Sequence, residues 1–353
     1  MLKEKETIGK FQNDIKNINF FEIEKKVTVA NQEAVRRRLF GADVRQVAAT
    51  VPAPKVGINV KQAVPEDLNS KTRIIGVHRT GALGDVILTT PIVRRLKELY
   101  PEKEIWISTI CPDAYWNNPR VAKVVRSKGE IASDVIFDLD LVYEKDPKRL
   151  ITSAYAEAVF GSDDFDLKPE MWSTTQNFVR ARSMLSGIDF TKDKVIVIHM
   201  AVSWPNRTWP REKWMNVIRG LSAQNYRVVV IGRGSDFKAD LYGGVYNLND
   251  ILNVQEIREV IRNAGCFVGM DSGMIHVAQT TSTPIVGMFT CAKAEYRISR
   301  YENVTPLIPS VDCYGCLHEQ APPVTFVGCK RGDLKCLTDI TPEMVVNAIK
   351  KYF

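Results

Sequence analysis

From residue 73 onward the chain alternates short apolar runs with amphipathic segments, and this alternation constrains the fold more than any other feature. The apolar runs are typical of buried strands, and the segments between them carry apolar residues at helical spacing. Strands that alternate with helices predict parallel sheets covered by helices on both faces. We expect strands at 73–78, 104–110, 134–143, 194–200, 226–232, 266–270 and 284–290, and helices at 86–100, 211–225, 254–265 and 273–281.

The strands fall into two series, so the 353 residues are expected to form two α/β halves. We place the first half at 71–190 and the second at 191–353, with a terminal helix. Residues 1–70 differ from both. They hold a polar start, a helix-like segment at 31–49 and a two-proline stretch at 50–57 that indicates a linker or a capping loop. This extension is expected to serve as an adaptor, an oligomer contact or an acceptor-binding arm.

Composition excludes several classes of protein. No apolar run approaches the roughly 20 residues that span a bilayer, and the N-terminus lacks the apolar core of a signal peptide, so we expect a cytoplasmic protein. Seven cysteines in such a chain favour reduced thiols or a metal site over disulfides. The net charge of +7 suits an anionic partner.

Polar clusters follow several of the expected strands, at 81–85, 203–211, 232–236 and 271–276. In open parallel sheets, ligands gather beyond the carboxyl ends of the strands. Because clusters come from both halves, we expect a ligand-binding cleft between them.

The first cluster is Gly81, Gly84 and Asp85 in "GALGD". The glycines let the backbone turn sharply and approach a ligand, and a helix N-terminus after the turn favours anions. Asp85 either acts chemically at this turn or only caps the helix. The stretch matches neither the G-x-G-x-x-G nor the P-loop motif, so dehydrogenases and P-loop NTPases are disfavoured.

The cluster at 203–211 contains basic residues, and the cluster at 271–276 lies at the start of an expected helix. Arg207, Arg211 and Lys213 lie among three tryptophans, which either hold these cations for a phosphate or belong to the core. Asp271, Ser272 and Gly273 open a helix, where a carboxylate can accept hydrogen bonds from sugar hydroxyls and a hydroxyl and free N–H groups can meet a phosphate. His276 lies one turn into that helix, a position typical of a packed residue.

Three stretches, in this order, resemble glycosyltransferase family 9, the ADP-heptose:lipopolysaccharide heptosyltransferase group: "GALGDVILTTPIVRRLK", "VIVIHMAVSWPNRTWPREKW" and "VGMDSGMIHVAQTTSTPIVGMF". The resemblance covers about residues 73–350. It implies the GT-B fold, in which two Rossmann-like domains with parallel sheets face each other across a cleft. It also implies an inverting reaction without a catalytic metal or cofactor.

The resemblance assigns roles to individual residues. Asp85 matches the catalytic base that faces the acceptor, with Gly81 and Gly84 in its loop. Asp271 matches the carboxylate that binds donor sugar hydroxyls, and Ser272 and Gly273 match the diphosphate site. The basic residue near the phosphates falls on Arg207 or Arg211, and His276 matches the motif histidine. The long N-terminal extension departs from the family.

Two further patterns concern metals. "FDLDL" at 137–141 has the D-x-D pattern of metal-dependent glycosyltransferases, but Asp138 and Asp140 alternate with apolar residues as in a half-buried strand, so we interpret them as structural. Near the C-terminus, four cysteines have a spacing that suits a structural zinc ion or, alternatively, reduced thiols: Cys313, Cys316, Cys329 and Cys336. Cys111, Cys266 and Cys291 are expected to be buried thiols.

The sequence therefore favours a glycosyltransferase that takes a nucleotide-diphosphate sugar, with ADP-heptose first, to a hydroxyl of a glycan or glycolipid such as lipopolysaccharide core, with a peripheral membrane contact. One alternative is the same fold with another nucleotide sugar and a protein or hydroxylated-DNA acceptor; no nucleic-acid motif supports DNA. Another is a catalytically silent GT-B binding module that docks through residues 1–70.

Overall fold

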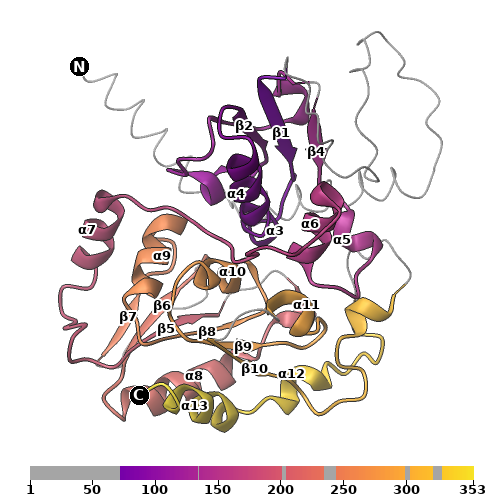
Figure 1. Cartoon of the computed structure of the whole chain (residues 1–353). Coiled ribbons are helices and arrows are strands. Elements are labelled where there is room, and N and C mark those ends of the chain that lie inside the picture. Colours follow the sequence, from indigo (N-terminus) through magenta and orange to yellow (C-terminus); the bar gives the residue numbers. More distant parts are fainter. Residues whose placement is uncertain (1–71, 134, 201–203, 234–243, 299–302, 321–327) are drawn as a thin grey trace, which may run out of the picture. The chain divides into compact units, whose positions relative to one another are not determined.

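The structure, a computed structural model, describes residues 72–133, 135–200, 204–233, 244–298, 303–320 and 328–353. Contacts within the chain divide it into Met1–Ala53 and Pro54–Phe353, and all the described residues belong to the second unit. The N-terminal extension and its expected helix at 31–49 lie outside the described residues. Figure 1 shows the described part as two groups of parallel strands with helices packed on them.

The first sheet has four parallel strands in the order β3-β2-β1-β4. They are β1 (Ile74–His78), β2 (Glu104–Ser108), β3 (Lys123–Val125) and β4 (Ile136–Asp138). In its register Ile75 lies beside Ile105. The chain builds β1, β2 and β3 outward on one side and then returns to place β4 on the other side of β1.

The second sheet has six parallel strands in the order β10-β9-β8-β5-β6-β7. They are β5 (Val195–His199), β6 (Arg227–Ile231), β7 (Val245–Asn247), β8 (Cys266–Met270), β9 (Ile285–Met288) and β10 (Val304–Leu307). This is a doubly wound order, which reverses between the neighbouring strands β5 and β8. Every residue of β5 and β8 is buried, as expected for strands covered on both faces.

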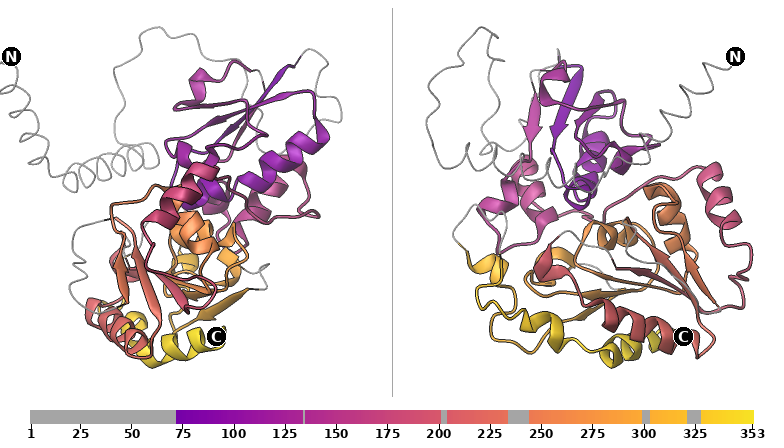
Figure 2. Two further views of the ribbon diagram at one scale, coloured as in Figure 1. Left: turned by 90° about the vertical axis from the view of Figure 1, so that its left-hand side faces the viewer. Right: turned by 180° about the vertical axis from the view of Figure 1, so that it is seen from behind.

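Helices cover both faces of the second sheet. Ile196 and Ile198 pack into the core that holds α8 (Arg211–Ser222) and α13 (Pro342–Lys350), whereas Val195 and Val197 point to the opposite core. On that opposite face lie α9 (Val254–Arg262), which also contacts α7 (Thr175–Ser183), and α10 (Gly273–Gln279). The two views in Figure 2 show α8 and α13 together on one side of the strands.

The remaining helices are short, apart from α4 (Thr90–Leu99) and α6 (Ile151–Phe160) in the first half. The short ones are α3 (Leu83–Ile87), η1 (Pro112–Tyr115), η2 (Lys128–Glu130), α5 (Val142–Lys145), η3 (Pro205–Arg207), α11 (Glu295–Ile298), η4 (Cys316–Glu319) and α12 (Lys335–Asp339). The α/β fold with two parallel sheets and the terminal helix α13 are as predicted. Within the described ranges, every helix is too short or too polar to cross a membrane.

The prediction of one continuous helix at 86–100 is wrong. The segment is divided into α3 and α4, with Leu88 and Thr89 between them. The Thr89 and Thr90 hydroxyls donate hydrogen bonds to the carbonyls of Val86 and Ile87, each at 2.7 Å. Pro91 has no N–H to continue the ladder and suits the first turn of a helix. The threonines and the proline of "GALGDVILTTP" therefore end one helix and begin the next.

The strand expected at 134–143 is also shorter than predicted. β4 ends at Asp138, and Leu141 adopts a left-handed conformation with φ of 60° before α5 begins. The apolar–polar alternation of "FDLDL" therefore continues past the end of the strand. Asp140 lies outside the sheet, so its role comes from the contacts it makes after β4.

Candidate active site

The clusters that carry Asp85 and Asp271 lie where the order of each sheet reverses. In the first sheet this point lies between β1 and β4, and the segment that carries Asp85 follows β1 directly. In the second sheet it lies between β5 and β8, and Asp271 follows β8. At such points the connections from two neighbouring strands leave toward opposite faces of the sheet, and the crevice between them is the usual ligand site of this architecture.

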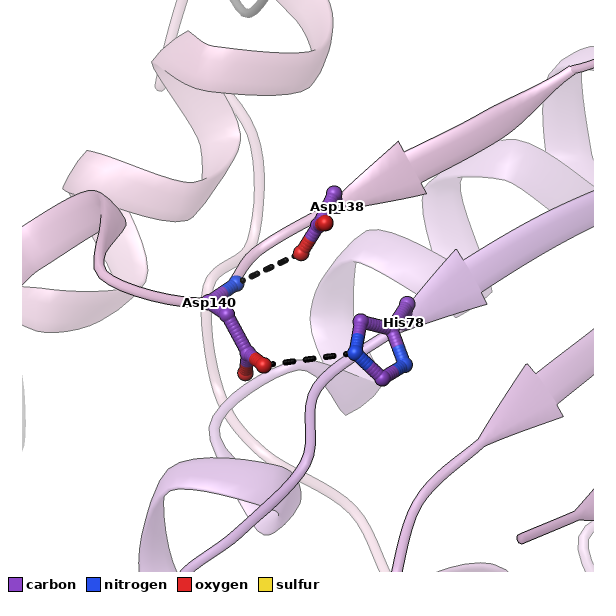
Figure 3. A group of neighbouring side chains, drawn as sticks. All are labelled: His78, Asp138 and Asp140. Carbon is purple, nitrogen blue, oxygen red and sulfur yellow. Dashed lines mark hydrogen bonds and ion pairs between the residues drawn. The ribbon is translucent and has the colours of Figure 1, made fainter. Parts of the chain in front are cut away.

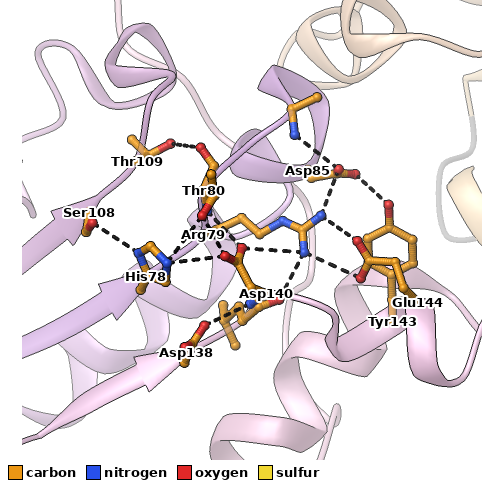
Figure 4. A network of polar contacts seen from close by, with 12 residues as sticks. His78, Arg79, Thr80, Asp85, Ser108, Thr109, Asp138, Asp140, Tyr143 and Glu144 are labelled. Atoms are coloured by element: carbon orange, nitrogen blue, oxygen red, sulfur yellow. Dashed lines mark hydrogen bonds and ion pairs between the residues drawn. The ribbon is translucent and has the colours of Figure 1, made fainter. Parts of the chain in front are cut away.

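Asp85 is held by contacts from three directions (Figure 4). Its Oδ2 accepts a hydrogen bond from Arg79 Nη2 at 2.9 Å and one from the backbone N–H of Ala82 at 3.3 Å, while its Oδ1 accepts one from the Tyr143 hydroxyl at 3.3 Å. The side chain is 19% exposed. Asp85 therefore does cap α3, as the simpler interpretation held, but it is also an oriented carboxylate in an ion pair.

Arg79 binds a second carboxylate. Its Nη2 lies 2.8 Å from Glu144 Oε1, and its Nη1 donates to the Leu139 carbonyl at 3.1 Å. The Arg79 guanidinium is 5% exposed, and it lies over the ring of Tyr143. Burial raises the pKa of Glu144 although Arg79 opposes this shift. One buried cation thus serves two carboxylates on the side of the first sheet.

Asp271 is the centre of the second cluster. It is buried, with 3% of its surface exposed, and its Oδ2 lies 3.5 Å from Arg207 Nη1 and 3.8 Å from Arg297 Nε. Burial alone would raise the pKa of Asp271, but Arg207 and Arg297 outweigh burial and lower it. Asp271 is therefore an ionised carboxylate between two arginines. Ser272 is the N-cap residue of α10, and its hydroxyl lies 3.4 Å from Nδ1 of His199 at the end of β5.

The structure separates the three basic residues of the second stretch. Arg207 reaches Asp271 and lies over the Trp204 ring at 4.1 Å from its centroid. Arg211 is an exposed residue at the start of α8, and Lys213 donates to the Ile340 carbonyl at 2.8 Å, so Lys213 holds the C-terminal segment instead. Trp209 and Trp214 pack against each other in the core. Of the two rival arginines, Arg207 is the one beside Asp271.

Two glycines bring the clusters together. A Cβ atom on Gly84 would lie 2.7 Å from His276 Cδ2 and 3.1 Å from Gly273 Cα, and one on Gly273 would lie 3.3 Å from Gly84 N. No side chain fits there without displacement, so α3 and α10 pack at the distance that glycine permits. At Gly81 the nearest atom to such a Cβ would be 3.4 Å away, on Ile110, which is an ordinary contact.

His276 belongs to this packing. Its Nδ1 lies 3.0 Å from Gln279 Oε1, and burial is the main reason why its pKa is lowered. The ring is therefore neutral near pH 7 and supports the contact between α10 and Gly84. These contacts favour a structural role for His276.

His78, Asp138 and Asp140 form a compact cluster at the ends of β1 and β4 (Figure 3). Among the described residues, this is the group of metal-ligand side chains whose candidate atoms all lie within 4.8 Å of one another. Each already has partners. Asp138 binds Lys128 at 2.7 Å, while Asp140 binds His78 at 3.2 Å and accepts the Thr80 N–H at 2.9 Å. These contacts favour the structural interpretation of both aspartates.

The C-terminal cysteines lie near one another and are reduced. Burial first, and then the other cysteines of this region, raise the pKa of Cys336 to about 11. Backbone N–H groups of 331–334 hydrogen-bond Cys329 and lower its pKa. Cys291 belongs to the same group and is buried, as predicted for Cys291 and Cys266. Cys111 is only half-buried.

The cluster expected at 232–236 is described only as far as Arg233. That residue lines a cavity of about 420 Å³, together with Arg180, residues 250–253 just before α9, and Glu256 in its first turn. The cavity lies beyond the carboxyl ends of β6 and β7, at the edge of the second sheet.

Sequence patterns missed four residues of the two clusters: Arg79, Tyr143, Glu144 and Arg297. Each lies outside the polar clusters that we singled out, and each reaches its site through contacts between separate parts of the chain. Arg79 had one local signal, since it directly follows β1 and is a charged residue at the end of an apolar strand. Arg297 and Tyr143 meet across the two halves, with the guanidinium 5.6 Å from the ring centroid.

Known structures share this architecture. A glycosyltransferase family 9 protein from Veillonella parvula DSM 2008 superposes with a TM-score of 0.66 at 16% identity, over 79% of this chain and 97% of that one. The iron-containing dodecameric glycosyltransferase TibC from enterotoxigenic E. coli H10407 gives 0.61 at 18% identity, over 79% and 75%. With its two parallel sheets, each with a site at its reversal point, the chain has the GT-B fold.

Sequence comparison then gives the family. The profile of glycosyltransferase family 9 (heptosyltransferase) matches residues 127–323, more than half of the chain, so the chain belongs to that family. Lipooligosaccharide heptosyltransferase 2 of Haemophilus influenzae (strain ATCC 51907 / DSM 11121 / KW20 / Rd) is 22% identical over 157 residues. That alignment covers 42% of this chain and 43% of the relative, which is less than half of the relative's length.

Proposed function

We propose that the chain transfers a sugar, heptose from ADP-heptose in the first place, to a hydroxyl group of an acceptor. The observation that carries the proposal is the approach of α3 to α10 at Gly84 and Gly273. Through it, an oriented carboxylate of the first half, Asp85, shares one region with the carboxylate and arginine of the second half, Asp271 and Arg207. The family membership and the heptosyltransferase relative support the choice of donor.

In the proposed reaction Asp85 takes the proton of the acceptor hydroxyl while the oxygen attacks the anomeric carbon. The bond from that carbon to the diphosphate breaks in the same step, so the configuration inverts. Asp271 accepts hydrogen bonds from sugar hydroxyls, and Arg207 stabilises the charge that grows on the leaving diphosphate. Arginine here does what a divalent cation does in metal-dependent enzymes, so the step needs no catalytic metal.

A structural metal is a separate part of the proposal. Cys313, Cys316, Cys329 and Cys336 offer four thiols, which would bind a metal as thiolates, a set that suits zinc or iron in tetrahedral geometry. The backbone N–H groups around Cys329 stabilise its thiolate form, which is the form that binds a metal. A bound metal would link the segments 313–316 and 329–336, so its binding energy would stabilise the folded state.

Other parts of the assignment remain predictions: the boundary at 190/191, the glycan or glycolipid acceptor, the cytoplasmic location and the role of residues 1–70. The two sheets fall on opposite sides of that boundary, with β4 before it and β5 after it.

The test compares two variants with a matched control. Asp85→Asn should lower turnover by at least about 10²-fold and leave ADP binding unchanged, because general-base catalysis is lost but the donor groups remain. Asp271→Asn should weaken binding of ADP-heptose through lost hydrogen bonds. Glu170→Gln is the control, since Glu170 also lies between two arginines and is 18% exposed. It should keep both properties.

Two outcomes would reject parts of the proposal. Wild-type turnover by Asp85→Asn, with the true acceptor, would remove the general base and leave Asp85 as a helix cap. If ADP, UDP and GDP at millimolar concentration all fail to raise the melting temperature of the wild-type protein, the donor site itself is excluded. If only UDP or GDP raised the melting temperature, the proposed sugar transfer would stand, but the donor would carry uridine or guanosine in place of adenosine.

A further inference from the structure

Three buried polar atoms around Asp271 have no hydrogen-bond partner within the described residues: Arg207 Nε, Arg297 Nε and Asp271 Oδ2. The two arginines approach the carboxylate at 3.5 and 3.8 Å, which is close enough for an ion pair but too long for a good hydrogen bond. Buried polar groups in native proteins are normally paired. Three unpaired polar atoms so close together indicate a binding site, in which a polar ligand would supply the missing hydrogen bonds.

The sign of the local charge says what kind of ligand that is. Around Asp271 two guanidinium groups face one carboxylate, which leaves an excess of one positive charge. Around Asp85 the balance is opposite, since Arg79 serves both Asp85 and Glu144. The excess positive charge therefore lies on the side of the second sheet, where an anion would be bound.

Arg297 is held against this point. Its side chain is 7% exposed, and Asp271, Tyr143 and Asp85 together raise its pKa above the usual arginine value despite the opposing effect of burial. The Tyr143 ring lies under its guanidinium, and Tyr143 also donates to Asp85. Arg297 is thus a permanent cation fixed between the carboxylate of one half and an aromatic ring of the other.

We infer that Arg297 is a second diphosphate-binding residue, which acts with Arg207 as a pair of cations for the donor's phosphates. This inference rests on the proposed function, because it names the group of the donor that Arg297 contacts. A guanidinium can bind two phosphate oxygens at once through its fork of N–H donors. Two such forks around Asp271 match a diphosphate better than a single phosphate.

The experiment measures the affinity of the purified full chain for ADP, AMP and adenosine by calorimetry. Arg297→Gln should weaken ADP binding about 10- to 100-fold, the effect of losing one charged hydrogen bond, and should leave adenosine binding unchanged. Arg297→Lys keeps the charge without the fork, so its ADP affinity should lie between the two. Arg258→Gln is the control, because Arg258 is a half-buried arginine that is also paired with a carboxylate, Glu259 at 2.9 Å.

The outcomes separate the inference from the proposed function. If the wild-type protein binds neither ADP nor another nucleoside diphosphate, the proposed function fails first. If it binds ADP and Arg297→Gln binds it equally tightly, Arg297 is structural and the inference is overturned. The inference is also rejected if Arg297→Gln loses affinity for ADP and adenosine equally, or if Arg258→Gln loses affinity for ADP as well. Either result would mean that the substitution disturbs the structure in general. Should Arg297→Gln not fold, Arg297→Lys with wild-type ADP affinity rejects the inference.

Discussion

Arg79 shows how much one buried side chain can determine. Arg79 forms ion pairs with both Asp85 and Glu144. Among the described residues, neither carboxylate has a second cation at ion-pair distance. Arg79→Met should lower the free energy of unfolding by about 3–5 kcal/mol, because two carboxylates lose their partner. Glu144→Gln should cost less than half of that, since Arg79 keeps Asp85. Urea denaturation of both variants measures the difference. Equal decreases in the free energy of unfolding would contradict the view that Arg79 stabilises both Asp85 and Glu144.

His199, at the end of β5, predicts a dependence of stability on pH. Burial lowers its pKa to about 4 from 6.5, so the unfolded chain takes up a proton between these values and the folded chain does not. The stabilisation is complete above about pH 6.5 and declines as the pH falls toward 4. Between about pH 7 and 5 the wild-type protein should lose about 2 kcal/mol more than His199→Gln. Parallel pH profiles for the two proteins would contradict this origin.

At the scale of elements, the contact between α3 and α10 depends on glycine. Gly84→Ala should force the helices apart and cost about 1–3 kcal/mol, with a loss of turnover because Asp85 moves with α3. Gly220→Ala in α8 is the matched control, since a Cβ there meets nothing within 4 Å. It should raise stability by about 1 kcal/mol through helix propensity. Thermal melts and kcat of both variants test the contrast.

The elements also show how far sequence patterns reach. Strands and helices with clear periodicity, such as β8 and α9, lie where they were predicted, because burial on defined faces leaves a local signal. The helix at 86–100 and the strand at 134–143 failed because threonine hydroxyls, a proline and a left-handed residue end elements that hydropathy alone would continue. Arg297 and Tyr143 could not be found this way, since their partners are far away in the sequence.

For the whole molecule, metal removal is the clearest test of the cysteine cluster. Protein prepared without chelators should contain close to one zinc or iron per chain, and Cys336→Ser should lose it and melt at a lower temperature, because binding energy stabilises the folded state. Cys266→Ala is the control, since Cys266 is buried in the second sheet. A wild-type protein free of both metals, with a chelator-insensitive melting temperature, would leave the cysteines as reduced thiols.

The core of the second sheet is completed only when the last residues of the chain have been synthesised. The indole N–H of Trp209, a fully buried side chain, donates to the carbonyl of Ile340, 131 positions further along, and Val345 and Ile349 belong to the same core. At typical rates of synthesis, on the order of 10 s pass between these positions. During that interval the face of the strands that α13 will cover is open to other chains. We therefore expect the half that carries Asp271 to bury its core later in synthesis than the half that carries Asp85.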